Sequence, residues 1–138
     1  MADVAPPVEP LCVRWIRDRL ADHGETVTVG VGVPAGWTAD ESPHVQVVSD
    51  GTPRLSWPVA THPTVRIVVR ARQTTEAQRL CSLAQAVLVD HPGSSGAGGQ
   101  IATVRALTGV MPVRDTETRA ELAWATCQVS IRMERITA

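Results

Sequence analysis

The pattern that most restricts the fold is a run of strict alternation at residues 122–133. Apolar side chains at every second position are separated by larger or more polar ones, among them Trp124 and Thr126. Successive side chains of a β-strand point to opposite faces of its sheet. The run therefore predicts one long strand, whose apolar face consists of Ala123, Ala125, Cys127, Val129, Ile131 and Met133.

A second alternating run at residues 64–72 predicts another strand with two different faces. Its apolar face carries Val65, Ile67, Val69 and Ala71. Its other face carries Arg66, Val68, Arg70 and Arg72. Shorter extended pieces are expected at residues 27–33, 44–49, 54–57 and 101–107. Gly109, Pro112 and Asp115 indicate a connection between the last two strands.

Two further segments have the apolar spacing of amphipathic helices. The first covers residues 8–20 and is ended by Gly24. The second covers residues 75–89, where Thr75 and Gln78 have the spacing of a capping box. Its expected buried stripe is Ala77, Leu80, Cys81, Ala84, Val87 and Leu88. Together these elements predict an α+β fold in which two helices pack on one face of a mixed or antiparallel sheet.

The composition indicates which class of protein this is, but it says little about an activity. The chain has 138 residues, 43% hydrophobic and 20% charged, which suits a single domain covering residues 1–138. A formal net charge of -1 does not favour a strong nucleic-acid or membrane binder. No apolar run approaches the roughly 20 residues that span a bilayer, and residues 1–10 lack the regions of a signal peptide. We therefore expect no membrane partner, and synthesis inside the cell.

Candidate catalytic and metal-binding residues are scattered along the chain. The four histidines are His23, His44, His62 and His91. Each lies beside a turn or a proline and no pair has helical i,i+3 or i,i+4 spacing, so solvent-facing loop histidines are expected. The cysteines fall on apolar faces and are expected to be buried rather than nucleophilic, namely Cys12, Cys81 and Cys127. We expect no catalytic residue, no metal site and no cofactor.

Three segments are expected to be mobile loops, at residues 34–43, 51–63 and 93–99. The last is rich in Gly and Ser, but it follows a helix and lacks a lysine, which favours a flexible linker over a phosphate-binding loop. Trp37 and Trp57 lie in the other two loops, where no sequence feature predicts their burial. Tryptophan is enriched in interface hot spots, although each could instead fold back over the domain's own core.

The polar face of the two long strands is the other candidate surface. Arg66, Arg70 and Arg72 line it, and they could form a solvated or subunit-facing stripe. A nucleic-acid surface is disfavoured, because interleaved aromatics and a basic net charge are both missing. Leu122, Trp124 and Val68 indicate that a neighbouring subunit partly covers this face. The candidate interface residues are therefore Trp37, Arg54, Trp57, Arg66, Arg70, Arg72 and Trp124.

The order of these elements resembles the tail terminator proteins of long-tailed, non-contractile bacteriophages. The resemblance covers most of the chain and begins with residues 10–16, which open the first helix. It continues with the extended residues 43–47 before the turn at Gly51, and with residues 65–71 followed by the helix that starts near residues 75–77 and runs to Val89. The final long strand completes it, with Arg119, Ala123 and Trp124.

The resemblance implies a structural virion protein rather than an enzyme. Subunits would form a ring, expected to be a hexamer, that docks on the last ring of tail-tube protein and stops its polymerisation. The far face of the ring would meet the head-tail connector or head-closure protein. DNA would pass through the lumen without sequence-specific binding, and the protein would be located in the virion at the head-tail junction.

Two alternatives remain open at the level of the sequence. The first is a head-closure or other neck protein of the same junction, which would change only the position of the ring within that junction. The second belongs to another class, a small ligand-binding α+β domain that uses the sheet face of Arg66, Arg70 and Arg72.

Overall fold

A computed structural model of the chain describes residues 2–4, 7–50, 55–56, 60–92, 101–114, 121–132 and 134–136. Within these ranges, only the backbone is described for residues 2–4, 55–56, 60–61, 114, 132 and 134–136.

Two helices form where the apolar spacing predicts them. Helix α1 spans Val8–Asp22 after Pro7 and ends at His23, and Gly24 follows with a φ of 78°. Such a positive φ favours glycine, which explains why the helix stops there. Helix α2 spans Thr74–Val89. All six residues of its predicted stripe are buried, namely Ala77, Leu80, Cys81, Ala84, Val87 and Leu88.

The strands form one large sheet with the order β2-β3-β6-β9-β5-β4, and β7 and β8 also pair with β9. Their bounds are β2 Thr28–Gly30, β3 His44–Ser49, β4 Leu55–Ser56, β5 Ala60–Thr61, β6 Thr64–Ala71, β7 Ile101–Ala106, β8 Met111–Arg114 and β9 Glu121–Arg132. Strands β2 and β3 are parallel and the other pairs are antiparallel, so the sheet is mixed. A separate antiparallel pair joins β1 (Ala2–Val4) to β10 (Glu134–Ile136).

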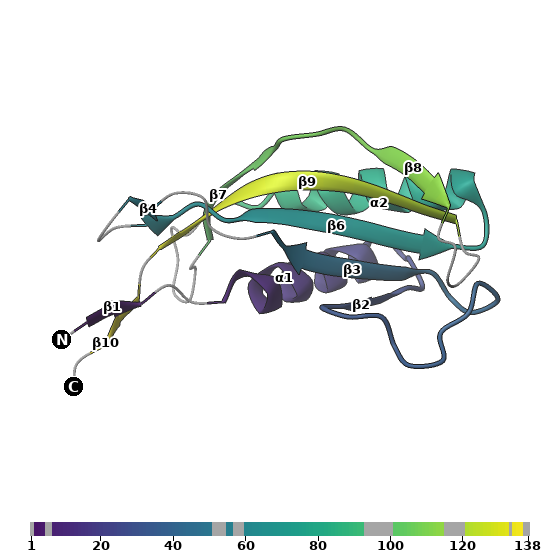
Figure 1. Cartoon of the computed structure of the whole chain (residues 1–138), viewed down its shortest axis with the longest axis horizontal. Helices are drawn as coiled ribbons and strands as arrows, with labels where there is room; N and C mark the ends of the chain where they lie inside the picture. Colours follow the sequence, from purple (N-terminus) through teal and green to yellow (C-terminus); the bar gives the residue numbers. More distant parts are fainter. Residues whose placement is uncertain are drawn as a thin grey trace.

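Both helices lie on the same side of the sheet (Figure 1). Helix α1 contacts β2 and β3, while α2 contacts β6, β7 and β9 and packs beside α1. The core between the layers contains the predicted apolar faces of β6 and β9, from Val65 to Ala71 and from Ala123 to Ile131. The predicted α+β fold, with two helices on one face of a mixed sheet, is confirmed. None of the described helices is long and apolar enough to cross a membrane.

Local details differ from the sequence-based expectations. Residues 111–114, expected in a connection, form β8, which pairs with the first residues of β9. Pro112 argued against a strand here, because proline has no N–H to donate. It is tolerated in β8, which is an edge strand with no outer partner for that N–H among the described strands. The extended piece expected at residues 27–33 forms a strand only over Thr28–Gly30. The expected capping box at α2 is wrong, because the N-cap residue is Gln73 and no side chain caps the helix.

Candidate functional site

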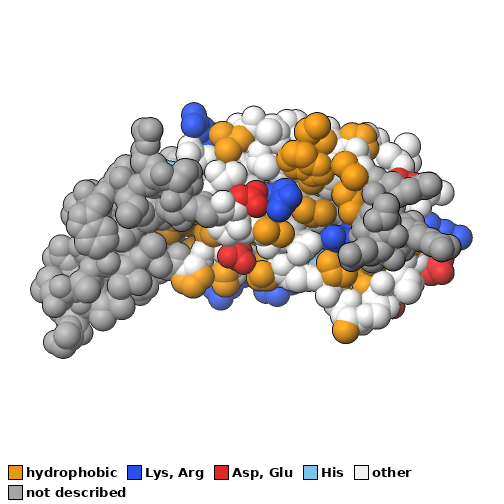
Figure 2. Space-filling model, in the orientation of Figure 1, with side chains coloured by type: hydrophobic (Ala, Val, Ile, Leu, Met, Phe, Trp, Pro, Cys, Tyr) orange, Lys and Arg blue, Asp and Glu red, His pale blue; other side chains and the backbone are white. Residues whose placement is uncertain are grey.

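The face of the sheet that no helix covers brings most of the described candidate residues together. In the strand register, Arg66 lies between Val48 and Thr126, and Val68 lies between Gln46 and Trp124. Arg70 lies between His44 and Leu122, and β8 adds Met111 opposite Trp124 and Val113 opposite Leu122. Figure 2 looks onto this face, where hydrophobic side chains gather over β6, β8 and β9 with basic side chains among them.

A hollow of about 450 Å³ lies in the middle of this face. It is lined by Gln46, Val48, Arg66, Val68, Arg70, Val113, Leu122 and Trp124. Val68 is only 8% exposed and Trp124 is partly buried, whereas Met111 and Val113 are each 48% exposed. The hollow therefore combines an apolar floor with two guanidinium groups, and exposed apolar side chains adjoin it on β8.

The two arginines that line the hollow are held in place by neighbouring side chains. Arg66 donates from Nη2 to Oδ1 of Asp50 at 3.2 Å, and Arg70 donates from Nη1 to Oε1 of Gln46 at 2.8 Å. The Nε of Arg66 is buried and has no hydrogen-bond partner among the described residues. Arg105 makes a similar contact elsewhere on this face, from Nε to Oε1 of Gln128 at 2.9 Å. Arg72 is exposed just beyond the end of β6 and does not line the hollow.

Trp37 is not part of this surface. Its side chain is 7% exposed, and its Nε1 donates to the carbonyl oxygen of Ser42 at 3.0 Å. Its backbone N–H bonds to the carbonyl of Pro34, across a turn in which Gly36 has a φ of 76°. Trp37 is therefore buried within its own loop, and it is not among the residues of the main hydrophobic core. Sequence reasoning missed this because the hydrogen bonds join positions that have no repeating pattern.

Part of the expected interface lies outside the described residues. Arg54 and Trp57 are both outside them, as are the predicted mobile loop at residues 93–99 and most of the one at residues 51–63. The loop at residues 34–43 is described, and its own hydrogen bonds hold it, as Trp37 illustrates.

His44 corrects the expectation that all four histidines face solvent. It lies in β3 and is 2% exposed. Its Nε2 lies 2.6 Å from the carbonyl oxygen of Gly32, which can only accept, so Nε2 carries the proton. The neutral ring then accepts from the hydroxyl of Thr28 at Nδ1, also at 2.6 Å. Burial, with a contribution from the charge of Arg70, lowers the pKa of His44, although the bond to Gly32 opposes the shift.

The other histidines lie apart from one another. His62 Nδ1 is 2.8 Å from the hydroxyl of Ser130, and the ring of His91 packs against Trp15 with 4.4 Å between centroids. Burial lowers the pKa of His91. Among the described residues, no group of three or more His, Cys, Asp or Glu side chains is placed to hold a metal ion.

The three cysteines are buried in the core, as predicted, and they form no disulfide with one another. Burial is the main cause that raises the pKa of Cys12 and of Cys81 to about 12, and that of Cys127 to about 11. The thiolate is the nucleophilic form of cysteine, so at neutral pH these side chains act as small apolar core residues.

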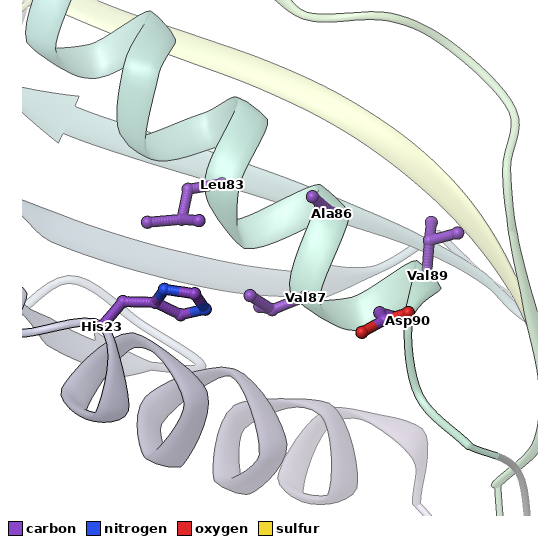
Figure 3. A pocket seen from close by; sticks show the side chains of 6 residues that line it. All are labelled: His23, Leu83, Ala86, Val87, Val89 and Asp90. Atoms are coloured by element: carbon purple, nitrogen blue, oxygen red, sulfur yellow. The ribbon is translucent and has the colours of Figure 1, made fainter.

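A second hollow, of about 480 Å³, lies on the helix layer between the end of α1 and α2 (Figure 3). It is lined by His23, Leu83, Ala86, Val87, Val89 and Asp90. Among the described residues that line it, only His23 and Asp90 are charged or titratable, and they lie at opposite ends of the row of side chains in Figure 3. They therefore do not form an acid–base pair, and the sheet face remains the stronger candidate site.

Sequence reasoning missed Met111 and Val113 as part of this surface. The signal was present, because apolar residues flank Pro112 with the alternation of a strand. Pro112 and Gly109 are more typical of a connection, so the sequence predicted no strand at these residues. The predicted apolar patch on the sheet face was therefore limited to β6 and β9.

No protein-family model matches the sequence, and no curated protein matches it.

Proposed function

We propose that this chain is a structural virion protein that forms a ring at the head-proximal end of the tail tube of a long-tailed, non-contractile bacteriophage. The ring ends tube polymerisation and joins the tail to the head connector, and DNA passes through its channel. The viral assignment rests on the order of elements. The observation that carries the assembly role is the helix-free sheet face, with its hollow lined by Trp124, Val68 and two arginines.

The composition of this face supports a protein partner rather than plain solvation. An antiparallel sheet with one solvated face normally alternates apolar and polar residues, so that its outer face is polar. Here the outer face instead carries Val48, Val68, Leu122 and Trp124, with Met111 and Val113 beside them. Tryptophan, methionine and arginine are among the residue types enriched at interfaces. A neighbouring subunit that covers this face would bury all three.

The charge of the hollow favours a ring over a two-fold dimer through this face. In a two-fold contact the same surface meets itself. A two-fold contact through the hollow would bring Arg66 and Arg70 of both copies into one interface, and like charges brought together are costly. A head-to-tail contact joins this face to a different surface of the next subunit, and a closed series of such contacts forms a ring.

The electrostatics also suit a channel through which DNA moves. Arginine–phosphate contacts add affinity that does not depend on sequence. The domain has a net charge of -1, and a neighbouring subunit would cover Arg66 and Arg70 in the proposed ring. These two arginines would therefore not line the channel and hold the DNA backbone.

Electron microscopy of the purified protein, alone and added to tail tubes of the same virus, tests the proposal. We expect closed rings, and one ring at the head-proximal end of each tube. A protein that stays monomeric and forms no ring on tubes would contradict it. A ring found only on the head side of the junction would favour the alternative assignment, a head-closure or neck protein.

One observation favours a second class of function, a small ligand-binding domain. The hollow of about 450 Å³ falls in the size range of small-molecule sites, and Arg66 offers a buried Nε without a described partner. Thermal stabilisation by small anionic metabolites would support this function. Unchanged unfolding temperatures across such a panel would leave the assembly role as the better account.

A further inference from the structure

We propose that the loop at residues 31–43 of one subunit occupies the sheet-face hollow of the next subunit, where Asp40 and Glu41 meet Arg66 and Arg70. This inference rests on the proposed ring and names the contact that would build it. It commits to a second copy of this chain as the occupant of the hollow, on the basis of charge and shape.

The loop has the chemistry that the hollow lacks. It projects beyond the β2 edge of the sheet (Figure 1) and exposes the carboxylates of Asp40 and Glu41. Asp40 has no hydrogen-bond or ion-pair partner in the part of the chain that the structure describes. Among the described residues, the carboxylate of Glu41 accepts only one weak bond, from the backbone N–H of Thr38 at 3.4 Å. Val31, at the start of the loop, is 46% exposed and offers an apolar contact for the floor of the hollow.

The hollow presents the complementary groups. Arg66 and Arg70 give it two positive charges beside the partly buried Trp124 and Leu122. The Arg66 side chain is 42% exposed, so its guanidinium group can donate to a carboxylate of a neighbour in addition to Asp50. Arg66 already bonds to Asp50 and Arg70 to Gln46, so the two carboxylates of the loop would add a charged acceptor for these guanidinium groups.

Trp37 makes the loop suitable for docking without touching the partner. Its indole is buried and bonded to Ser42, and its backbone N–H closes the turn from Pro34. The backbone N–H of Glu41 bonds to the carbonyl of Thr38 and closes a second turn. A segment already held in its bound shape loses less conformational entropy on association. Trp37 is therefore a positioning residue for the two carboxylates.

The loop and the hollow are different surfaces, as a head-to-tail contact requires. None of the residues that line the hollow belongs to the loop, although Gln46 touches both, because its side-chain amide also donates to the carbonyl of Val31 at 3.2 Å. Another exposed apolar–acidic pair, Val89 and Asp90 at the end of α2, offers only one carboxylate for two arginines. Asp90 therefore serves as the matched control.

The experiment uses charge reversal on each side of the contact. Asp40→Arg reverses the loop and Arg70→Glu reverses the hollow. The controls are Asp90→Arg and Arg17→Glu, because Asp90 is also an exposed acid and Arg17 is an exposed arginine of α1, in the helix layer on the other side of the sheet. Thermal unfolding checks that every variant folds, and light scattering after gel filtration measures the size of the assembly.

We expect each control to form rings, and Asp40→Arg or Arg70→Glu alone to stay monomeric at concentrations where the unchanged protein assembles. An equimolar mixture of the two reversed variants should form rings again. In the mixture, a reversed loop meets a reversed hollow and an unchanged loop meets an unchanged hollow. These contacts require the two variants to alternate, so the restored ring has an even number of subunits.

The outcomes separate this inference from the proposed function. If the unchanged protein forms rings and both reversed variants do so equally well, the loop–hollow contact is wrong and the ring proposal stands. Single variants that stay monomeric, together with a mixture that does not assemble, also overturn the pairing. If the unchanged protein forms no ring in solution or on tail tubes, the proposed function fails and this contact fails with it.

Discussion

Replacing His44 with phenylalanine tests whether this buried histidine connects β2 and the turn that follows it to β3. The phenyl ring is slightly larger than the imidazole and makes neither of its 2.6 Å hydrogen bonds, to Thr28 and Gly32. Each such bond contributes about 1 kcal/mol net to stability. Thr28 and Gly32 are exposed residues, so water can satisfy the groups left behind. The free energy of unfolding should therefore fall by about 2 kcal/mol.

Urea unfolding at a pH near 8, followed by tryptophan fluorescence, measures this change. The control is His23→Phe, since His23 is exposed at the end of α1 and its replacement should change stability by less than about 0.5 kcal/mol. A loss for His44→Phe as small as that of the control would refute the argument that this histidine fastens β2 and the following turn to β3.

The same variant should alter the pH dependence of stability. The pKa of His44 is lowered from 6.5 in the folded protein, so the unfolded chain binds the proton more readily. The stability that neutral His44 contributes is fully present above about pH 6.5 and is lost as the pH falls through its folded pKa. The difference between the unchanged protein and His44→Phe should therefore shrink on acidification. His91, whose pKa is also lowered, contributes equally to both proteins and cancels. A difference that stays constant or grows would contradict the sign of the shift.

Three further predictions concern the core, the buried thiols and the sheet-face interface. Leu80→Ala removes a fully buried side chain of α2 and should lower the free energy of unfolding by about 2–5 kcal/mol, measured by urea titration. The three thiols should resist iodoacetamide at about pH 8 in the folded protein and react once urea unfolds it, namely those of Cys12, Cys81 and Cys127. The reason is that burial raises their pKa values to about 11 to 12. Rapid alkylation of the folded protein would argue against their burial. Trp124→Ala should weaken ring assembly roughly 30-fold or more while the isolated domain stays folded, measured by light scattering across a concentration series; unchanged assembly would show that the sheet face is not the interface.

The parts of the fold that follow a regular period could be predicted from the sequence. The stripe of α2 and the alternating faces of β6 and β9 are local patterns, and burial follows them except at Val68, which is buried on the other face of β6; Met133 lies outside the described residues. Strand pairing is not local. The parallel contact between β2 and β3 is what buries His44, and no periodicity of residues 44–49 contains that information.

The candidate surface was predictable only in part, for the same reason. Arg66, Arg70 and Trp124 were found because alternation places them on the polar faces of long strands. Their convergence on one hollow depends on the register between β6 and β9, and the apolar residues of β8 depend on a strand that Pro112 conceals. Trp37 was assigned to the surface because its burial depends on hydrogen bonds inside one loop.

Whether this chain assembles into a ring through its helix-free sheet face can be seen in the structure of the assembly on tail tubes, determined by electron microscopy. We expect a closed ring at the head-proximal end of the tube, with the face of Trp124, Arg66 and Arg70 covered by the adjacent subunit. A ring in which this face is open to solvent, or a tube that ends without this protein, would contradict it.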